Sequence, residues 1–269
     1  MKELYTRAIS GFIYALLLIG ALYFQTGLVI VLAVFGIISL AEFSKLIHLK
    51  SLFQYLIFII LYSCFSYFCL SNTVTTGSEE AIQILLVITI FVNLILIKDL
   101  FTTKKIPLFE SKRYITTTFY LSSGFVFMMQ IANYDNTFTP LLLLGAFILV
   151  WVNDSAAYII GKNFGRQKLF PSISPKKTVE GFLGGLFFAC VSSYFITLYT
   201  ASLSFNHWLI LAIIVSVIGT FGDLIESKFK RQAGVKDSGV IMPGHGGLLD
   251  RLDSLIFAAP FIYLFLRIA

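Results

Sequence analysis

Long apolar runs separated by short polar stretches are the main pattern of this chain. A helix needs roughly 20 mainly apolar residues to cross a bilayer, and about nine runs approach that length. The expected spans are Ala8–Phe24, Leu28–Phe43, Phe53–Leu70, Ala81–Ile97, Ile115–Ile131, Phe138–Ile160, Val179–Tyr199, Trp208–Ile225 and Leu252–Ile268. The first two are expected to form a tight hairpin that breaks near Gln25–Gly27. The pattern therefore predicts an all-α, polytopic membrane protein with about nine transmembrane helices.

Composition agrees with a membrane protein. Only 13% of the 269 residues are charged and 58% are hydrophobic, whereas a soluble domain carries about 25% charged residues. The net charge of +6 comes from basic residues in short loops between the apolar runs. These residues are expected to meet anionic lipid headgroups or phosphate-bearing substrates, and no nucleic acid. The cysteines Cys64, Cys69 and Cys190 lie inside apolar runs and are predicted to be inert packing residues.

The positions of Lys and Arg predict how the chain is oriented. With about nine spans the loops alternate between two sides, and every basic residue except Arg267 falls on the same side. Basic loops usually face the cytoplasm, so the N-terminus is expected inside and the C-terminus outside. Residues 1–135 are expected to form five scaffold spans with lipid access. Residues 136–269 are expected to form the catalytic region, with cytoplasmic polar loops at 161–178 and 226–251.

The most polar stretch of the chain, Ser227–Asp253, stands between two apolar runs and contains five glycines. Acidic residues in or beside spans are costly and usually functional. The acidic candidates are Asp154 in the sixth span, Asp223 and Glu226 at the end of the eighth, and Asp250 and Asp253 at the start of the ninth. Carboxylates converging beside many basic residues suit Mg²⁺ that bridges phosphates. The alternative is a set of helix-end charges solvated at the membrane interface.

A second polar segment precedes the seventh span. Pro175 is expected near a helix start with Ser174 as its N-cap. The free amide groups and positive dipole end of such a helix would form an anion site, and Lys176 and Lys177 would add charge. The alternative is a pair of lysines that anchors the chain at the cytoplasmic face.

Glycines mark two further features. The run Pro243–Gly247 exposes backbone that a phosphate can approach closely, although such runs also form plain turns. His245 within it is a candidate phosphate donor or acid, or simply an exposed loop residue. The glycines of Gly161–Gly165 and Gly181–Gly185, four residues apart in each pair, are predicted to pack helices closely rather than to bind a ligand.

Taken together, three segments resemble a known family. The stretch Ser227–Asp253 closely resembles the signature S-x-F-K-R-x4-K-D-x-G-x3-P-G-H-G-G-x2-D-R-x-D of phosphatidate cytidylyltransferases, the CDP-diacylglycerol synthases. Asn153–Tyr158 and Ser174–Gly181 are similar to two further blocks of that family. Ser155 and Ala156 stand where many members have Thr-Gly, which implies a small change in packing near Asp154. The resemblance covers roughly the last 120 residues and is silent on the N-terminal half.

The resemblance implies a bacterial inner-membrane enzyme, often a homodimer, with its active site on the cytoplasmic face. Such enzymes convert CTP and phosphatidate to CDP-diacylglycerol and pyrophosphate with Mg²⁺, and a second cation is left open. The residues expected to act in catalysis are Asp223, Asp250, Lys176, Lys177 and Arg251, of which Asp223 and Asp250 are expected to bind the metal. The residues expected to bind substrate are Ser174, Lys230, Arg231, Lys236, Asp237, Gly244, His245, Gly246, Gly247, Asp154 and Asp253.

Two other functions stay open on the sequence. A CTP-dependent lipid kinase also combines apolar spans with cytoplasmic phosphate loops, but it would need a base beside a lipid hydroxyl. A secondary transporter would place its charges near mid-membrane, whereas here they cluster at one face.

Overall fold

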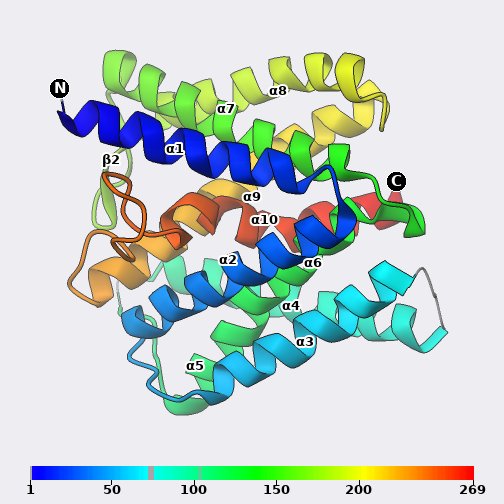
Figure 1. Ribbon diagram of the computed structural model, residues 1–269. Coiled ribbons are helices and arrows are strands. Elements are labelled where there is room, and N and C mark those ends of the chain that lie inside the picture. The colour runs from blue at the N-terminus through cyan, green and yellow to red at the C-terminus, as the bar shows by residue number, and fades with distance from the viewer. Residues whose placement is uncertain (1, 72–75, 103) are drawn as a thin grey trace.

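The structure is a computed structural model that describes residues 2–71, 76–102 and 104–269. It is a bundle of long helices with one small β hairpin (Figure 1). The first elements are α1 (Lys2–Ala21), α2 (Gln25–Leu46), α3 (Phe53–Ser71), α4 (Thr76–Leu100), α5 (Glu110–Thr116), the π-helix η1 (Thr117–Ser122), α6 (Ser123–Ala132) and the 3₁₀ helix η2 (Tyr134–Asn136). They are followed by α7 (Pro140–Phe164), β1 (Lys168–Phe170), β2 (Ser174–Thr178), α8 (Val179–Thr200), α9 (Phe205–Gln232) and α10 (Leu249–Ile268).

Seven helical segments of the described residues are long and apolar enough to cross a membrane. They are α2, α3, α4, α7, α8, α9 and the continuous segment Glu110–Ala132. This confirms the prediction of a polytopic helical membrane protein. In α1 the apolar part is only Ile9–Ala21, and α10 carries four charged residues along its length. The predicted count of about nine spans and the predicted orientation therefore stay predictions.

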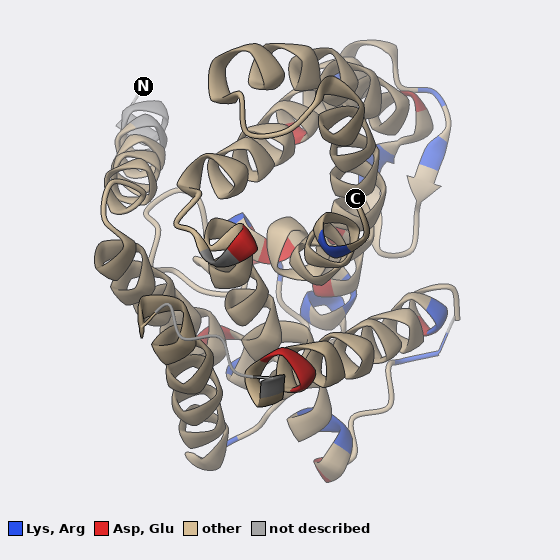
Figure 2. Ribbon diagram, turned by 90° about the vertical axis from the view of Figure 1, so that its right-hand side faces the viewer, with Lys and Arg blue, Asp and Glu red and all other residues tan. Residues whose placement is uncertain are grey.

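Charged residues are sparse along the helices. Most of each helix ribbon carries neither acidic nor basic residues (Figure 2). In Figure 1, β2 and the loop between α9 and α10 lie at one end of the bundle, and α10 ends at the opposite one. The polar segment before α8 and the polar segment after α9 thus share one end of the molecule, which will be called the polar end.

Several expected boundaries are wrong. The break in the first hairpin lies at residues 22–24, because Gln25 and Gly27 already belong to α2. Helix α7 continues to Phe164 and α9 continues to Gln232, so both polar loops begin later than expected. The extra turns of α9 are amphipathic, and tertiary contacts satisfy their polar side chains, which apolar run length does not reveal.

The predicted helix start at Ser174 is also wrong. Ser174–Thr178 forms strand β2, which pairs antiparallel with β1, so the chain is not entirely α. Helix α8 begins at Val179, and its N-cap is Thr178, whose hydroxyl accepts a hydrogen bond from the Gly181 N–H at 3.1 Å. Lys176 and Lys177 therefore lie on a strand before the helix. They do not form its first turn.

The helix pairs α7–α8 and α9–α10 form the most extensive contacts of the bundle. The glycines support the first pair as predicted. A Cβ on Gly181 would lie 2.7 Å from the Ala157 carbonyl and 3.1 Å from the Gly161 Cα, so larger residues would separate α7 from α8. Helix α10 also packs on α6 and α2, and the buried apolar residues of both halves form one cluster.

The fifth expected span, Ile115–Ile131, lies in the most buried of the seven apolar segments. About 78% of the residues in the apolar part of Glu110–Ala132 are buried in the protein. Its polar residues bond back to the helix itself, since the Ser122 hydroxyl donates to Thr117 O and the Ser123 hydroxyl to Phe119 O. The three cysteines are free; Cys64 is exposed on α3 rather than packed inside as predicted, and Cys69 and Cys190 are half-buried.

Candidate functional site

Three helices and the hairpin bring charged side chains together at the polar end. Lys177 of β2 forms an ion pair with Asp223 of α9, and the Ser227 hydroxyl donates to the other Asp223 oxygen at 3.2 Å. Asp154 of α7 and Asp253 of α10 both interact electrostatically with Asp223 and Lys177. These residues, which the sequence placed in separate motifs, thus form one group, called here the Asp223 cluster.

The ammonium of Lys177 is held in its charged form. Burial by itself would lower the pKa of Lys177, but the adjacent Asp223 carboxylate outweighs burial and raises the pKa above its ordinary value of 10.5. Both side chains of the pair are 29% exposed. The pair therefore presents a permanent positive charge beside a carboxylate at a place that ligands can reach.

A second cluster lies deeper, between α9 and α10. Lys230 forms ion pairs with Glu226, four residues earlier on α9, and with Asp250 at 2.6 Å. Asp250 also accepts hydrogen bonds from the backbone N–H groups of Gly247 at 2.7 Å and Ser238 at 3.0 Å. The side chain of Glu226 is fully buried. Lys230 thus bridges two carboxylates, and Asp250 organises the loop that precedes α10.

The glycine-rich loop is a set of tight turns. Gly244 and Gly246 have φ values of +78° and +88°, which residues with a side chain rarely adopt. His245 lies between them, and its Nδ1 is 2.8 Å from the hydroxyl of Ser10 on α1. Arg251 donates from Nη2 to the His245 carbonyl at 3.2 Å. The first helix of the chain therefore contacts a loop that the sequence linked only to the C-terminal half.

Other predicted site residues lie at the edge of this arrangement. Lys176, Lys236 and Asp237 are exposed, and no ion pair to them is found within the described residues. Arg231 is also exposed and donates to the carbonyls of Ile173 and Val235. Ser174 is half-buried on β2. The structure places these residues near the polar end but does not join them to either cluster.

The sequence analysis missed two residues that hold the site together. Glu42 on α2 is 2% exposed and accepts hydrogen bonds from the N–H groups of Leu248 and Leu249 and from the Ser238 hydroxyl. Ser238, in turn, donates its N–H to Asp250. A lone carboxylate inside an apolar span is costly. Glu42, within the expected span Leu28–Phe43, could have been singled out on that ground.

Magnesium can be tested against the donor chemistry of these residues. No group of three or more His, Cys, Asp or Glu side chains in the described part of the chain is arranged to hold a metal ion. Carboxylate oxygens are nevertheless the ligands that Mg²⁺ prefers, and Asp223 is reachable. Both oxygens of Asp250 already accept hydrogen bonds, so a cation there would replace the Lys230 ammonium. At Asp223 the Lys177 ammonium and the Ser227 hydroxyl likewise occupy both oxygens. The donor set therefore fits magnesium at either carboxylate only after its lysine moves away.

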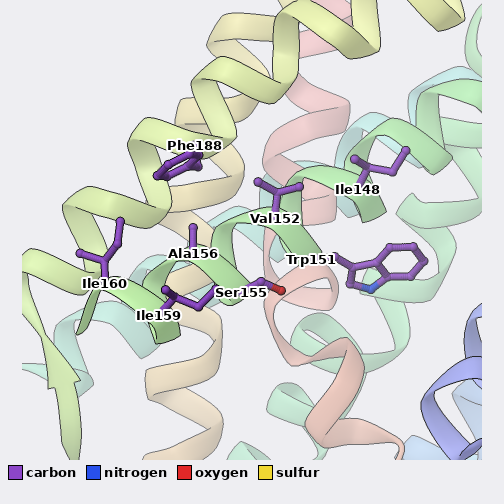
Figure 3. A pocket seen from close by; sticks show the side chains of 8 residues that line it. All are labelled: Ile148, Trp151, Val152, Ser155, Ala156, Ile159, Ile160 and Phe188. Atoms are coloured by element: carbon purple, nitrogen blue, oxygen red, sulfur yellow. The ribbon is translucent and has the colours of Figure 1, made fainter. Parts of the chain in front are cut away.

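An apolar pocket of about 440 Å³ lies between α7 and α8 (Figure 3). Its lining consists of Ile148, Trp151, Val152, Ser155, Ala156, Ile159, Ile160 and Phe188. None of these eight residues is charged. The pocket suits hydrocarbon and not nucleotide phosphates, although Ser155 directly follows Asp154 in the chain.

Known proteins are similar to this chain in sequence. Residues 5–269 match the cytidylyltransferase family. The chain is 38% identical to the phosphatidate cytidylyltransferase of Bacillus subtilis (strain 168) over 193 residues, 71% of this chain and 69% of that protein. It is 44% identical to the phosphatidate cytidylyltransferase of Staphylococcus aureus (strain COL) over 149 residues, 55% of each chain. It is 49% identical to that of Staphylococcus haemolyticus (strain JCSC1435) over 126 residues, 46% of this chain and 48% of that protein.

Proposed function

Because the chain belongs to the cytidylyltransferase family, we propose that it transfers the cytidylyl group of CTP to phosphatidate, giving CDP-diacylglycerol and pyrophosphate. The observation that carries the proposal is the Asp223 cluster, where Lys177 and three carboxylates from three helices meet at the polar end. The similar proteins of Bacillus and Staphylococcus carry the same activity in their names. Neither a lipid kinase nor a transporter is favoured by these relatives.

The reaction makes simple demands on the protein. A phosphate oxygen of phosphatidate attacks the α-phosphorus of CTP, the bond from that phosphorus to the bridging oxygen breaks, and pyrophosphate leaves with the electron pair. The attacking phosphate is already an anion near neutral pH, so no strong general base is needed. The protein must instead reduce the repulsion between two anions and align them.

The residues of the site divide these tasks. Lys177 supplies positive charge beside Asp223, where a triphosphate can approach. Lys176, Arg231, Lys236 and Arg251 are exposed around the same end and attract anionic substrates. Asp223 would hold magnesium when the Lys177 ammonium moves from it toward the substrate phosphates, with Asp250 as the second ligand when Lys230 gives way. The bound ion would neutralise charge on the CTP phosphates. Asp154 and Asp253 would orient the cytidine base or accept a second cation.

The loop residues complete the proposed site. The backbone of Gly244 and Gly246 would cradle a phosphate next to His245, while Asp237 and Ser174 would contact substrate at the edge. Gly247, also expected to bind substrate, is instead buried and donates its N–H to Asp250. Lys230 acts mainly by holding Glu226 and Asp250. The pocket between α7 and α8 would receive hydrocarbon of the lipid substrate.

We also propose the setting of the enzyme in the cell. The chain is an integral membrane protein, and its basic loops support a bacterial inner-membrane location with the polar end in the cytoplasm. On this proposal about nine helices cross the membrane, with α1 and α10 among them. Residues 1–135 serve as scaffold and lipid access, residues 136–269 carry catalysis, and two copies form a homodimer.

The test is product analysis with purified protein, labelled CTP, phosphatidate and Mg²⁺. The expected products are a CDP-lipid and pyrophosphate, whereas a phosphorylated lipid and CDP would contradict the proposal. Asp223→Asn and Asp250→Asn are expected to lower turnover roughly 10²- to 10³-fold. Glu110→Gln, at an exposed carboxylate on α5, is the matched control and should keep full turnover. Near-normal turnover of Asp250→Asn at saturating Mg²⁺ would reject its assignment.

A further inference from the structure

Glu42 is a carboxylate buried where burial is costly. It lies on α2, in the N-terminal half, and only 2% of its surface is exposed. No basic side chain is paired with it within the described residues. An ionised carboxylate without compensation would be strongly disfavoured at such a place, so its contacts must supply what water would otherwise provide.

Those contacts come from the start of α10 and the loop before it. The two Glu42 oxygens accept hydrogen bonds from Leu248 N at 3.2 Å, Leu249 N at 2.8 Å and the Ser238 hydroxyl at 3.2 Å. The first N–H groups of a helix lack partners within the helix and carry its positive dipole end. The N-cap residue of α10, Leu248, has no side chain that could satisfy them. Glu42 therefore caps α10 from another helix.

Two glycines of the loop make room for this carboxylate. A Cβ on Gly239 would lie 2.8 Å from the Glu42 Cδ, and one on Gly247 would lie 2.6 Å from its Oε2. Neither glycine adopts a positive φ, so backbone conformation does not require a glycine at these positions. Close approach to Glu42 is the physical reason for glycine at Gly239, and one of the reasons at Gly247, where the Ser238 hydroxyl is also close.

The same loop atoms also hold Asp250. Ser238 donates its hydroxyl to Glu42 and its N–H to Asp250. Gly247 donates its N–H to Asp250, and the next two N–H groups along the chain bind Glu42. Glu42 and Asp250 thus bind neighbouring groups of one loop and fix its conformation. This loop lies near the contact between α2 and α10 (Figure 1). A shift of Glu42 would move the groups that fix Asp250.

We propose that Glu42 is a positioning residue of the active site, through which the N-terminal half sets the loop 238–249 and the carboxylate of Asp250. Its effect on turnover rests on the proposed function, but its effect on the loop does not. Glu42→Gln keeps the size of the side chain but replaces one acceptor by an N–H₂ donor, which faces backbone donors that it cannot satisfy.

The first experiment measures turnover and amide hydrogen exchange of Glu42→Gln. We expect kcat to fall roughly 10- to 100-fold, as for other groups that orient a ligand, with the KM for phosphatidate unchanged. Exchange should rise in residues 238–250 and stay unchanged in α8. Ser44→Ala is the matched control, because Ser44 lies on α2 like Glu42 and its hydroxyl accepts a buried hydrogen bond from Gln54 of α3. Wild-type turnover and exchange in Glu42→Gln would overturn the proposal.

A second experiment keeps the proposal testable if Glu42→Gln does not fold. The three atoms nearest to the Cβ that Gly239→Ala adds all belong to Glu42. The substitution should therefore displace Glu42 and lower kcat about tenfold or more. In a Glu42→Ala background the same substitution should add nothing, because the clash is gone. If the two losses multiply instead, Glu42 and the loop act independently and the proposal is wrong. A wild-type protein without CDP-lipid synthesis would reject the proposed function, while the exchange data would still report on Glu42.

Discussion

Individual lysines at the polar end have different tasks, although the sequence offers them as one basic group. Lys177 meets Asp223 where both are partly exposed, whereas Lys230 is buried between Glu226 and Asp250. A buried lysine with two carboxylates has little capacity left for a substrate phosphate. Lys228 is different again, since it donates to the carbonyls of Asp99 and Thr102 at 2.6 and 2.8 Å.

Lys177 is therefore the lysine whose charge we expect the reaction to need most. Lys177→Met should lower kcat roughly 10²- to 10³-fold, because no other ammonium contacts Asp223 in the described structure. The ion pair is partly exposed, so the stability lost should be about 1 kcal/mol or less. Steady-state kinetics and thermal unfolding in detergent measure both effects. The control is Lys168→Met, an exposed lysine on the neighbouring strand; an equal loss there would argue against a specific role.

At the scale of elements, the hairpin and the start of α8 form one unit that places Lys177. Thr178 caps α8, and Glu180 accepts hydrogen bonds from the N–H groups of Arg166 at 3.0 Å and Gln167 at 3.1 Å. These hydrogen bonds join the chain before β1 to the chain after β2 and so fix both ends of the hairpin. From a strand fixed in this way, Lys177 reaches Asp223 of α9 directly.

The last turns of α9 hold the segment between α4 and α5 in place through side-chain hydrogen bonds. Lys228 donates to carbonyls at the end of α4, and the Gln232 side chain exchanges two hydrogen bonds with the backbone of Ile106. Lys228→Met should leave those carbonyls unsatisfied and lower the free energy of unfolding by about 1–3 kcal/mol. Thermal unfolding in detergent measures this loss. If Lys228→Met instead raises the KM for CTP at unchanged stability, Lys228 binds substrate and the proposed structural role of Lys228 is wrong.

At the scale of the whole molecule, the two halves are built into each other. Helix α10 packs on α6 and α2 as well as on α9, and Glu42 and Ser10 reach the glycine-rich loop from the first two helices. The C-terminal half therefore depends on the N-terminal half for its shape. This dependence was not visible in the motifs, which all lie in the C-terminal half.

The two ends of the bundle should face opposite sides of the membrane. Lys236→Cys, in the loop before α10, should react with a membrane-impermeant maleimide only in inverted vesicles. Ala269→Cys, beyond α10, should react only in intact cells with a permeable outer layer. The background is a chain in which Cys64, Cys69 and Cys190 are replaced by alanine. Labelling of both positions from the same side would mean that α10 does not cross the membrane and would reject the proposed orientation.

The sequence by itself determined the class of the protein and the position of its polar end. Apolar run length and sparse charge are sufficient for a helical membrane protein, because the bilayer leaves few other ways to satisfy the backbone. Asp223 and Asp250 stood out because acidic residues beside spans are costly, and Lys177 because it was expected at a helix start that forms an anion site. Glycine spacing predicted the contact between α7 and α8, which the structure confirms.

The tertiary structure alone decided which charges pair. A carboxylate does not reveal from its neighbours in sequence whether it will meet Lys177, Lys230 or a helix N-terminus, since each partner comes from a distant segment. For the same reason, neither strand β2 nor the turns of α9 beyond the apolar run were expected. Glu42 is the clearest case: a lone acid in an apolar run became the group around which the glycine-rich loop folds.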